Sequence, residues 1–259
     1  MSQYFNFNYS EILAAFLVLM RISAFIVSWP LFGENNVPRP IKIFFALLLT
    51  IMLFPVVPRE NIAFSMGTYE IFFRVFKEVL IGLSLGFLSR MFFYIMSIAG
   101  QIISVSMGLS GAQLMNPATG ARSTPMSQLQ VMLASLFFLA IHGHHMLLIA
   151  LTESFKIIKI SELYISFEAF GTFGVLVQRI TLIGVQLSAP VLISILIMNV
   201  VMAIIGRAVP QINVLITSLP VNILVGLMVV LISIPMIVGK MPVILDETTV
   251  NMMKLLKSY

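Results

Sequence analysis

The stretch that decides the fold is Ile71–Met107, which reads IFFRVFKEVLIGLSLGFLSRMFFYIMSIAGQIISVSM. It is apolar over nearly its whole length, and a membrane-spanning helix needs only about 20 mostly apolar residues. About 37 residues would rise roughly 55 Å as a straight helix. The sequence therefore predicts a helix here that overshoots a bilayer, and that kinks, tilts or projects beyond it.

The composition of the whole chain extends this prediction to its other segments. Hydrophobic residues make up 59% of the 259 residues and charged residues only 10%, whereas ordinary soluble domains carry about 25% charged residues. Lipid or a large apolar partner must cover so much apolar surface. We expect one all-α membrane domain over residues 1–259. The remaining predicted helices are Ser10–Phe32, Ile41–Val57, Gln128–Phe155, Leu176–Ile205, Val214–Val238 and a short amphipathic tail, Asp246–Tyr259.

Several classes of function lack the residues that they require. Cysteine is absent, and the net charge of +5 is scattered rather than gathered into a nucleic-acid stripe. No P-loop, GxSxG or HExxH motif occurs, so we expect no catalytic and no cofactor-binding residues. The N-terminus lacks the basic region of a signal peptide, so we expect the first helix to be retained. His142, His144 and His145 are clustered, but metal ligands on a helix need spacings of three or four with carboxylates nearby; we expect no metal site.

Charged residues inside the apolar stretches are costly. Arg21 and Arg90 fall mid-segment, with Lys77 and Glu78 near the start of the long stretch. A charge at the bilayer centre costs about 2.5–3.5 kcal/mol. Two interpretations stay open: an ion pathway or channel lining, or pairing with a carboxylate or backbone carbonyl across a helix interface. We favour pairing.

Breaks in the helices are the other informative feature. Pro190 lies inside a predicted helix and predicts a kink, and Pro210 follows in the next link. The segment Gly108–Pro125 is rich in Gly, Ser, Thr, Asn and Pro; it fits either a gate loop inside a pore or an ordinary connection. Gly82 and Gly86 form a GxxxG pattern, which predicts close helix packing.

Together these residues resemble one family over almost the whole chain, from Arg21 to Gly239. The residues that carry the resemblance, in order, are Arg21, Pro30-Leu31-Phe32-Gly33, Pro38, Lys42, Glu78, Gly82, Gly86, Gly100-Gln101-Ile102-Ile103-Ser104, Met107-Gly108-Leu109-Ser110, Asn116-Pro117, Gly143-His144, Ala189-Pro190, Asn199, Arg207, Pro210-Gln211-Ile212-Asn213, Pro220 and Gly226. The sequence is similar to the flagellar biosynthesis protein FliR family, shared with the T-type export-apparatus proteins of virulence type III secretion. Asn116 stands where the family usually has Asp, and Ala203 where it often has Gly.

The resemblance implies a fold of kinked helical hairpins, with a FliP-like unit at about residues 1–175 followed by a FliQ-like unit at 176–259. It implies a subunit of the flagellar type III protein export gate, which forms and gates the channel for unfolded flagellar proteins and is not an enzyme. The alternatives are a virulence export apparatus, a small-solute secondary transporter, an intramembrane enzyme and a passive assembly scaffold.

The resemblance also assigns roles to residues. The pore plug or gate loop would comprise Met107, Gly108, Leu109, Ser110, Gly111, Asn116 and Pro117. Interhelical or subunit polar contacts would come from Arg21, Glu78, Arg90, Arg207, Gln211 and Asn213. The implied partners are FliP-like, FliQ-like and FlhB-like proteins, exported unfolded proteins and membrane lipid, with no nucleic acid. The implied location is the bacterial inner membrane, multi-pass, in the flagellar basal body.

Overall fold

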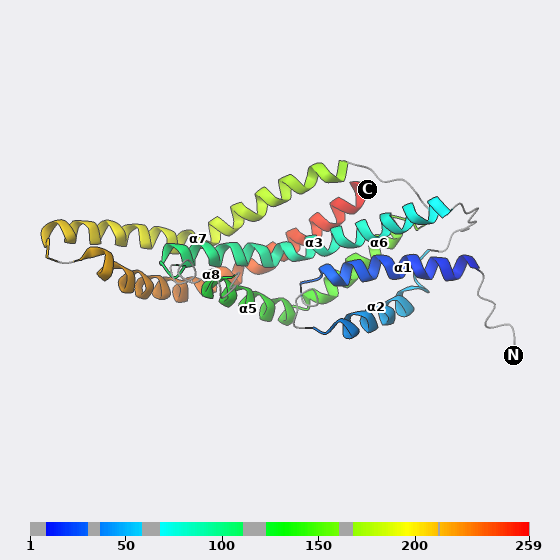
Figure 1. The fold of residues 1–259 in the computed structure, drawn as a ribbon, viewed down its shortest axis with the longest axis horizontal. Helices are drawn as coiled ribbons and strands as arrows, with labels where there is room; N and C mark the ends of the chain where they lie inside the picture. The colour runs from blue at the N-terminus through cyan, green and yellow to red at the C-terminus, as the bar shows by residue number, and fades with distance from the viewer. Residues whose placement is uncertain are drawn as a thin grey trace. The chain divides into compact units, whose positions relative to one another are not determined.

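The computed structural model of the chain describes residues 9–30, 37–58, 68–110, 123–160, 168–211 and 213–258. Their regular structure consists of the helices α1 (Tyr9–Ser28), α2 (Arg39–Leu53), α3 (Thr68–Ser106), α5 (Pro125–Ala140), α6 (Gly143–Ile157), α7 (Glu168–Ala208) and α8 (Val214–Ser258) (Figure 1). Four of these, α1, α3, α7 and α8, are long and apolar enough to cross a membrane, and the bent pair of α5 and α6 would make a fifth span. The predicted all-α membrane fold is confirmed.

The bounds of the predicted helices shift by several residues, and two predictions differ in the number of helices. The stretch Gln128–Phe155, predicted as one helix, is two helices, because His142 has a left-handed backbone conformation with φ of 56°. A right-handed helix cannot continue through such a residue. The tail predicted as a separate helix is instead the end of α8, which runs on through Pro235 and Pro242. A proline removes one backbone hydrogen bond, and here the neighbouring turns keep the helix continuous.

The contacts of the chain group into two compact units. The first unit comprises residues 1–91, 142–174 and 246–259, and the second comprises residues 92–141 and 175–245. Both units are assembled from separated stretches of sequence. The division at about residue 175 into a FliP-like and a FliQ-like part stays a prediction.

In the first unit, α1 lies beside the first half of α3 (Figure 1). The apolar stripe of α1 is fully buried at Leu17, Val18, Ile22 and Phe25, which is the spacing of one helix face. A Cβ atom at Gly82 would clash with the backbone carbonyl of Arg21 and lie 2.8 Å from the Ala24 Cβ, and one at Gly86 would clash with the Ser28 side chain. The GxxxG pattern therefore serves close packing of two helices within this chain.

In the second unit, one apolar cluster joins α3, α5, α7 and α8. Its fully or nearly fully buried members are Ile103, Met107, Met126, Val191, Ile195 and Val230. Gly100 lets α3 approach the start of α5 closely, since a Cβ there would lie 2.7 Å from the Met126 carbonyl oxygen. Ser97 and Ser127 exchange a hydrogen bond of 3.0 Å across the same contact. This packing holds α3 against the first turn of α5.

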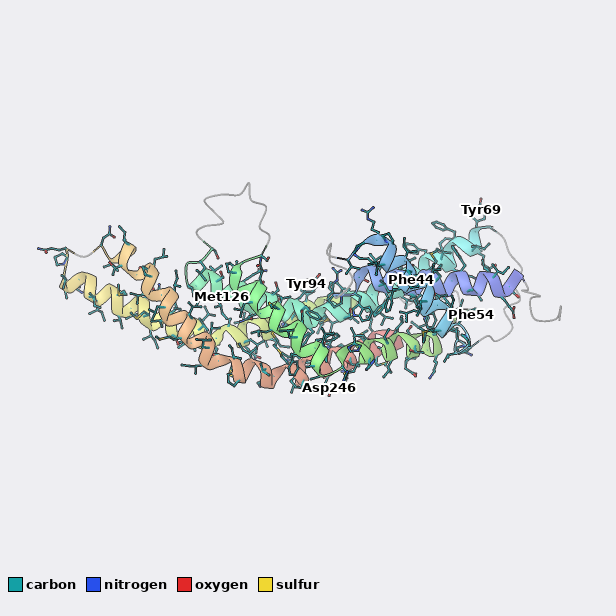
Figure 2. All side chains as sticks on the ribbon, turned by 90° about the horizontal axis from the view of Figure 1, so that it is seen from below. Phe44, Phe54, Tyr69, Tyr94, Met126 and Asp246 are labelled. Carbon is teal, nitrogen blue, oxygen red and sulfur yellow. The ribbon has the colours of Figure 1, made fainter. Side chains whose placement is uncertain are left out.

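Helices α7 and α8 leave most of their apolar surface uncovered. In the most apolar 18-residue stretch of each helix, 17% of the residues of α7 and 28% of those of α8 are buried, compared with 61% of those of α3. Apolar side chains such as Leu196, Leu231 and Ile232 are more than half exposed, and side chains stand out along both helices (Figure 2). Lipid or other apolar helices must cover these faces.

Candidate functional site

The central polar feature of the first unit is an ion pair between Arg21 of α1 and Glu78 of α3. Both side chains are at most 1% exposed. The Arg21 Nε and Nη2 atoms donate to the two carboxylate oxygens of Glu78 over 2.5 and 3.0 Å. This two-point geometry matches the planar guanidinium fork to the carboxylate. The charge that the sequence places in the middle of an apolar segment is thus paired inside the chain.

The same guanidinium also holds the C-terminal end of α6. Its Nη1 atom donates to the backbone oxygen and the hydroxyl of Ser154, over 2.9 and 3.2 Å, and its Nη2 atom donates to the backbone oxygen of Ile158 over 3.1 Å. With the two bonds to Glu78, each of the five guanidinium N–H groups has an acceptor. The guanidinium also lies 4.3 Å from the centroid of the Phe155 ring. Arg21 therefore fixes three helices to one another.

Two further cations of α3 bind the chain just beyond α6. Lys77, which is 1% exposed, donates from Nζ to the backbone oxygen of Lys159 over 3.0 Å. Arg74 donates to the backbone oxygen of Ile160 over 3.0 Å and pairs with Glu70 at 2.7 Å. Both acceptors lie in the short stretch that follows α6, which ends at Ile157. Lys77 is buried and Arg74 is partly buried, so two cations of α3 hold the chain where it leaves α6.

Arg90 serves the end of α1 in the same way. Its Nε donates to the backbone oxygen of Ser28, and its Nη2 donates to that of Val27 over 3.3 Å. These are the last two residues of α1. The predicted polar contacts Arg21, Glu78 and Arg90 all fall within the first unit, and each arginine donates to backbone oxygens at the C-terminal end of a helix.

The first residues of the predicted gate loop form a helix cap. Gly108 has φ of 80°; its N–H donates to the Val105 oxygen, and the Leu109 N–H donates to the Ser104 oxygen, both over 3.0 Å. This pair of bonds is the Schellman motif, in which glycine takes the left-handed position. Met107 is fully buried in the second unit's apolar cluster, with Leu109 packed against it. The loop therefore leaves α3 from a fixed point.

The far end of the same segment is also anchored. Thr124 is the N-cap of α5, and its hydroxyl accepts a hydrogen bond of 3.3 Å from the Ser127 N–H. Pro125 follows at the first helical position, where it is favoured. The predicted gate residues Gly111, Asn116 and Pro117 lie outside the described residues, between these two caps.

The predicted polar residues of the second unit separate into different roles. Asn213 caps α8, since its side-chain and backbone oxygens accept from the Ile216 N–H over 3.4 and 3.2 Å. Arg207 and Gln211 are exposed at the end of α7 and in the turn after it. Pro190 lies inside α7, and Pro210 lies in the turn between α7 and α8.

Sequence reasoning missed two parts of these arrangements. The acceptors at the end of α6 are backbone oxygens, which no residue type marks in a sequence. The bond of 2.8 Å from Asn222 of α8 to Asn199 of α7 joins residues that sequence analysis did not connect. An asparagine in each of two adjacent apolar segments is the signal that could have revealed it.

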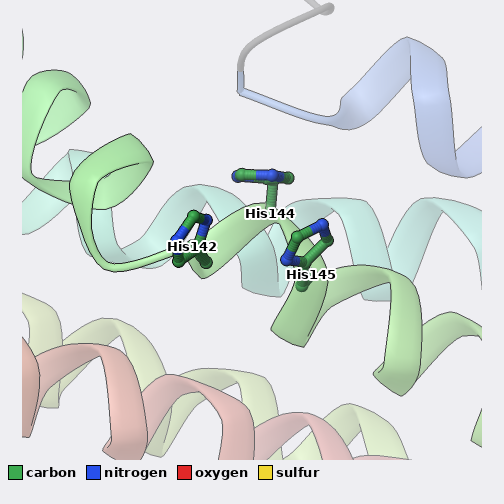
Figure 3. Close-up of side chains that lie close together, drawn as sticks. All are labelled: His142, His144 and His145. Atoms are coloured by element: carbon green, nitrogen blue, oxygen red, sulfur yellow. The ribbon is translucent and has the colours of Figure 1, made fainter.

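Within the described part of the chain, the three histidines at the start of α6 form a group that could hold a metal ion. Their possible ligand atoms all lie within 4.8 Å of one another (Figure 3).

The apolar helices and the buried polar contacts between them define a multi-pass helical membrane protein, in which the buried polar groups hold the helices together. Comparison with known proteins gives the particular family: the chain belongs to the bacterial export proteins, family 1, which match residues 12–248. It is similar to flagellar biosynthetic protein FliR of Bacillus subtilis, at 35% identity over 228 residues that cover 86% of this chain and 87% of the relative. FliR of Aquifex aeolicus is 30% identical over 226 residues, 85% of each chain. FliR of Escherichia coli is 28% identical over 222 residues, 86% of this chain and 84% of the relative. The predicted resemblance is confirmed.

Proposed function

We propose that this chain is a subunit of the flagellar protein-export gate, in which it helps to form and to close the channel for unfolded flagellar proteins. The observation that carries the proposal is the family match over nearly the whole chain, with relatives named flagellar biosynthetic proteins. Those names favour the flagellar system over a virulence apparatus. The role is structural and gating.

The exposed faces of α7 and α8 support assembly with other subunits. A groove of about 450 Å³ runs beside α7 and the end of α3, and its lining is mostly apolar, with Leu196, Val200 and Ala203 beside the polar Ser106 and Asn199. Such a surface suits a neighbouring helix that packs closely and offers one polar partner. We infer FliP-like and FliQ-like subunits as its occupants, and a FlhB-like protein as a further partner, in the inner membrane at the flagellar basal body.

The segment between Gly108 and Thr124 supports the gating part of the proposal. Two helix caps hold its ends, and its sequence is rich in Gly, Ala, Ser and Thr beside the apolar Leu114 and Met115. Long connections between helices are uncommon and are often functional. We infer that this segment obstructs the resting channel.

Deletion of Gly108–Ser110 tests the gating role. The deletion removes the cap and shortens the segment, so cells that carry the assembled complex should become permeable to small solutes. The matched control is the same deletion in cells without the FliP-like partner, which should stay tight because no channel assembles. Unchanged permeability, with the variant complex purified intact, would contradict the gating role.

A further inference from the structure

All three histidines of the chain gather at one place, the start of α6. They are the only histidines among its 259 residues, and the chain contains no cysteine. The ring centroids of His144 and His145 lie 4.3 Å apart, and those of His142 and His145 lie 5.5 Å apart with nearly parallel planes. Figure 3 shows the three rings side by side around the first turn of the helix. Every imidazole that this protein can offer to a ligand is therefore in one cluster.

The backbone at the start of α6 brings His142 against the first turn of the helix. His142 precedes the helix as its N-cap and has a left-handed conformation, with φ of 56°. His145 is the third helical residue, and its N–H donates to the His142 oxygen over 2.9 Å. Residues at these two positions face each other across the first turn, as the two partners of a capping box do. The sequence argument against a metal site assumed that all three residues were helical, and that assumption does not hold.

One ring nitrogen in the cluster is without a partner. The Nδ1 atom of His144 is buried and makes no hydrogen bond with any described residue. Buried polar atoms are nearly always satisfied. An imidazole nitrogen can be satisfied by a metal ion as well as by a hydrogen bond.

We propose that His142, His144 and His145 bind one divalent transition-metal ion of the Zn²⁺ class, with a fourth position left for water or a partner's ligand. In a tetrahedral site with bonds of about 2.0–2.1 Å, ligand nitrogens lie roughly 3.3 Å apart. The nitrogens here lie within 4.8 Å of one another. His142 and His145 are exposed, so rotation of their side chains closes the remaining gap.

The donor set selects the class of ion. Nitrogen ligands suit Zn²⁺, Ni²⁺, Co²⁺ and Cu²⁺, whereas Mg²⁺ and Ca²⁺ require oxygen ligands. A bound ion would join the N-cap residue to the first turn of α6. It would thereby hold His142 in its left-handed conformation, which an L-residue otherwise adopts at a cost.

Metal binding by the full-length chain tests the proposal directly. The protein is purified in detergent with an affinity tag that contains no histidine, dialysed against Zn²⁺, and its metal content is measured. Co²⁺ then serves as a spectroscopic probe, since a tetrahedral nitrogen site gives a visible absorption band. The expected result is one ion per chain and that band.

Variants assign the binding to the cluster. The double variant His142→Asn and His145→Gln changes only exposed side chains, and Asn also tolerates the left-handed conformation. Loss of a second-shell partner alone costs about 10–100-fold in affinity, so loss of two ligands should weaken Zn²⁺ binding by at least about 100-fold. The control Glu153→Gln removes an exposed carboxylate from the same helix and should leave binding unchanged.

Two results would overturn the proposal. The first is a wild-type chain that retains no Zn²⁺ after dialysis. The second is a double variant that binds Zn²⁺ as tightly as the wild type, which would place the ion on carboxylates elsewhere. Both measurements are independent of export, so they leave the proposed function untouched.

Discussion

Replacement of Arg21 by Met should be among the most destabilising single changes in the first unit. Met keeps much of the apolar volume but removes all five hydrogen bonds of the guanidinium. It also leaves the Glu78 carboxylate, 1% exposed, without its bidentate partner. Breaking a buried ion pair by removing one partner costs about 3–5 kcal/mol.

The double replacement Arg21→Met and Glu78→Met separates the orphaned charge from the other losses. The double variant has no carboxylate at position 78, and its main deficit is the backbone oxygen of Ile158, which loses its donor. An unsatisfied buried acceptor costs about 1–3 kcal/mol. The double variant should therefore be more stable than Arg21→Met alone by about 2 kcal/mol.

The single tryptophan supplies the assay. Trp29 is the only tryptophan in the chain and is 2% exposed, against the Phe25 ring at a centroid distance of 5.4 Å. Its fluorescence during a graded SDS titration in detergent reports unfolding of the first unit. The exposed Arg207→Met is the matched control and should leave the titration unchanged. A double variant no more stable than Arg21→Met would refute the reasoning.

Three smaller predictions concern helix packing and helix caps. For each, the change in stability is measured from the midpoint of thermal unfolding, followed by far-UV circular dichroism. Gly82→Ala should lower the free energy of unfolding by about 1–3 kcal/mol, because the new Cβ meets the Arg21 carbonyl. The control Gly239→Ala, in open space on α8, should raise it by up to about 1 kcal/mol. Equal effects of the two substitutions would contradict the close approach of α1 and α3. Gly108→Ala should lower the free energy of unfolding by about 1–2 kcal/mol. The added methyl group makes only ordinary contacts with Leu219, so the destabilisation comes from the φ of 80°. An unchanged stability would contradict the left-handed cap. Thr124→Ala should cost about 1 kcal/mol by removing the bond to the Ser127 N–H, and Thr124→Ser should restore most of it.

The existence of the apolar helices could be predicted because length and hydropathy determine it. The long helix predicted at Ile71–Met107 is α3, and its ends differ from the prediction by one to three residues. The break before α6 could not be predicted in this way, because the residue with the left-handed backbone is a histidine in an apolar run rather than a glycine. Continuity of α8 through Pro242 was missed because proline weakens a helix without necessarily ending it.

The polar contacts could also be predicted only in part from the sequence. The sequence marks Arg21 and Glu78 as residues that need partners, since an unpaired charge in an apolar segment is too costly. It cannot show that Arg21 also holds the end of α6, because those acceptors are backbone oxygens and every residue carries one. The same holds for Arg90 at the end of α1.

Native mass spectrometry of the chain, affinity-purified in detergent from its own cells, tests the central claim most directly. The account predicts one complex in which this chain co-purifies with small hydrophobic FliP-like and FliQ-like proteins at a fixed stoichiometry. A lone monomer or a simple homodimer would contradict it.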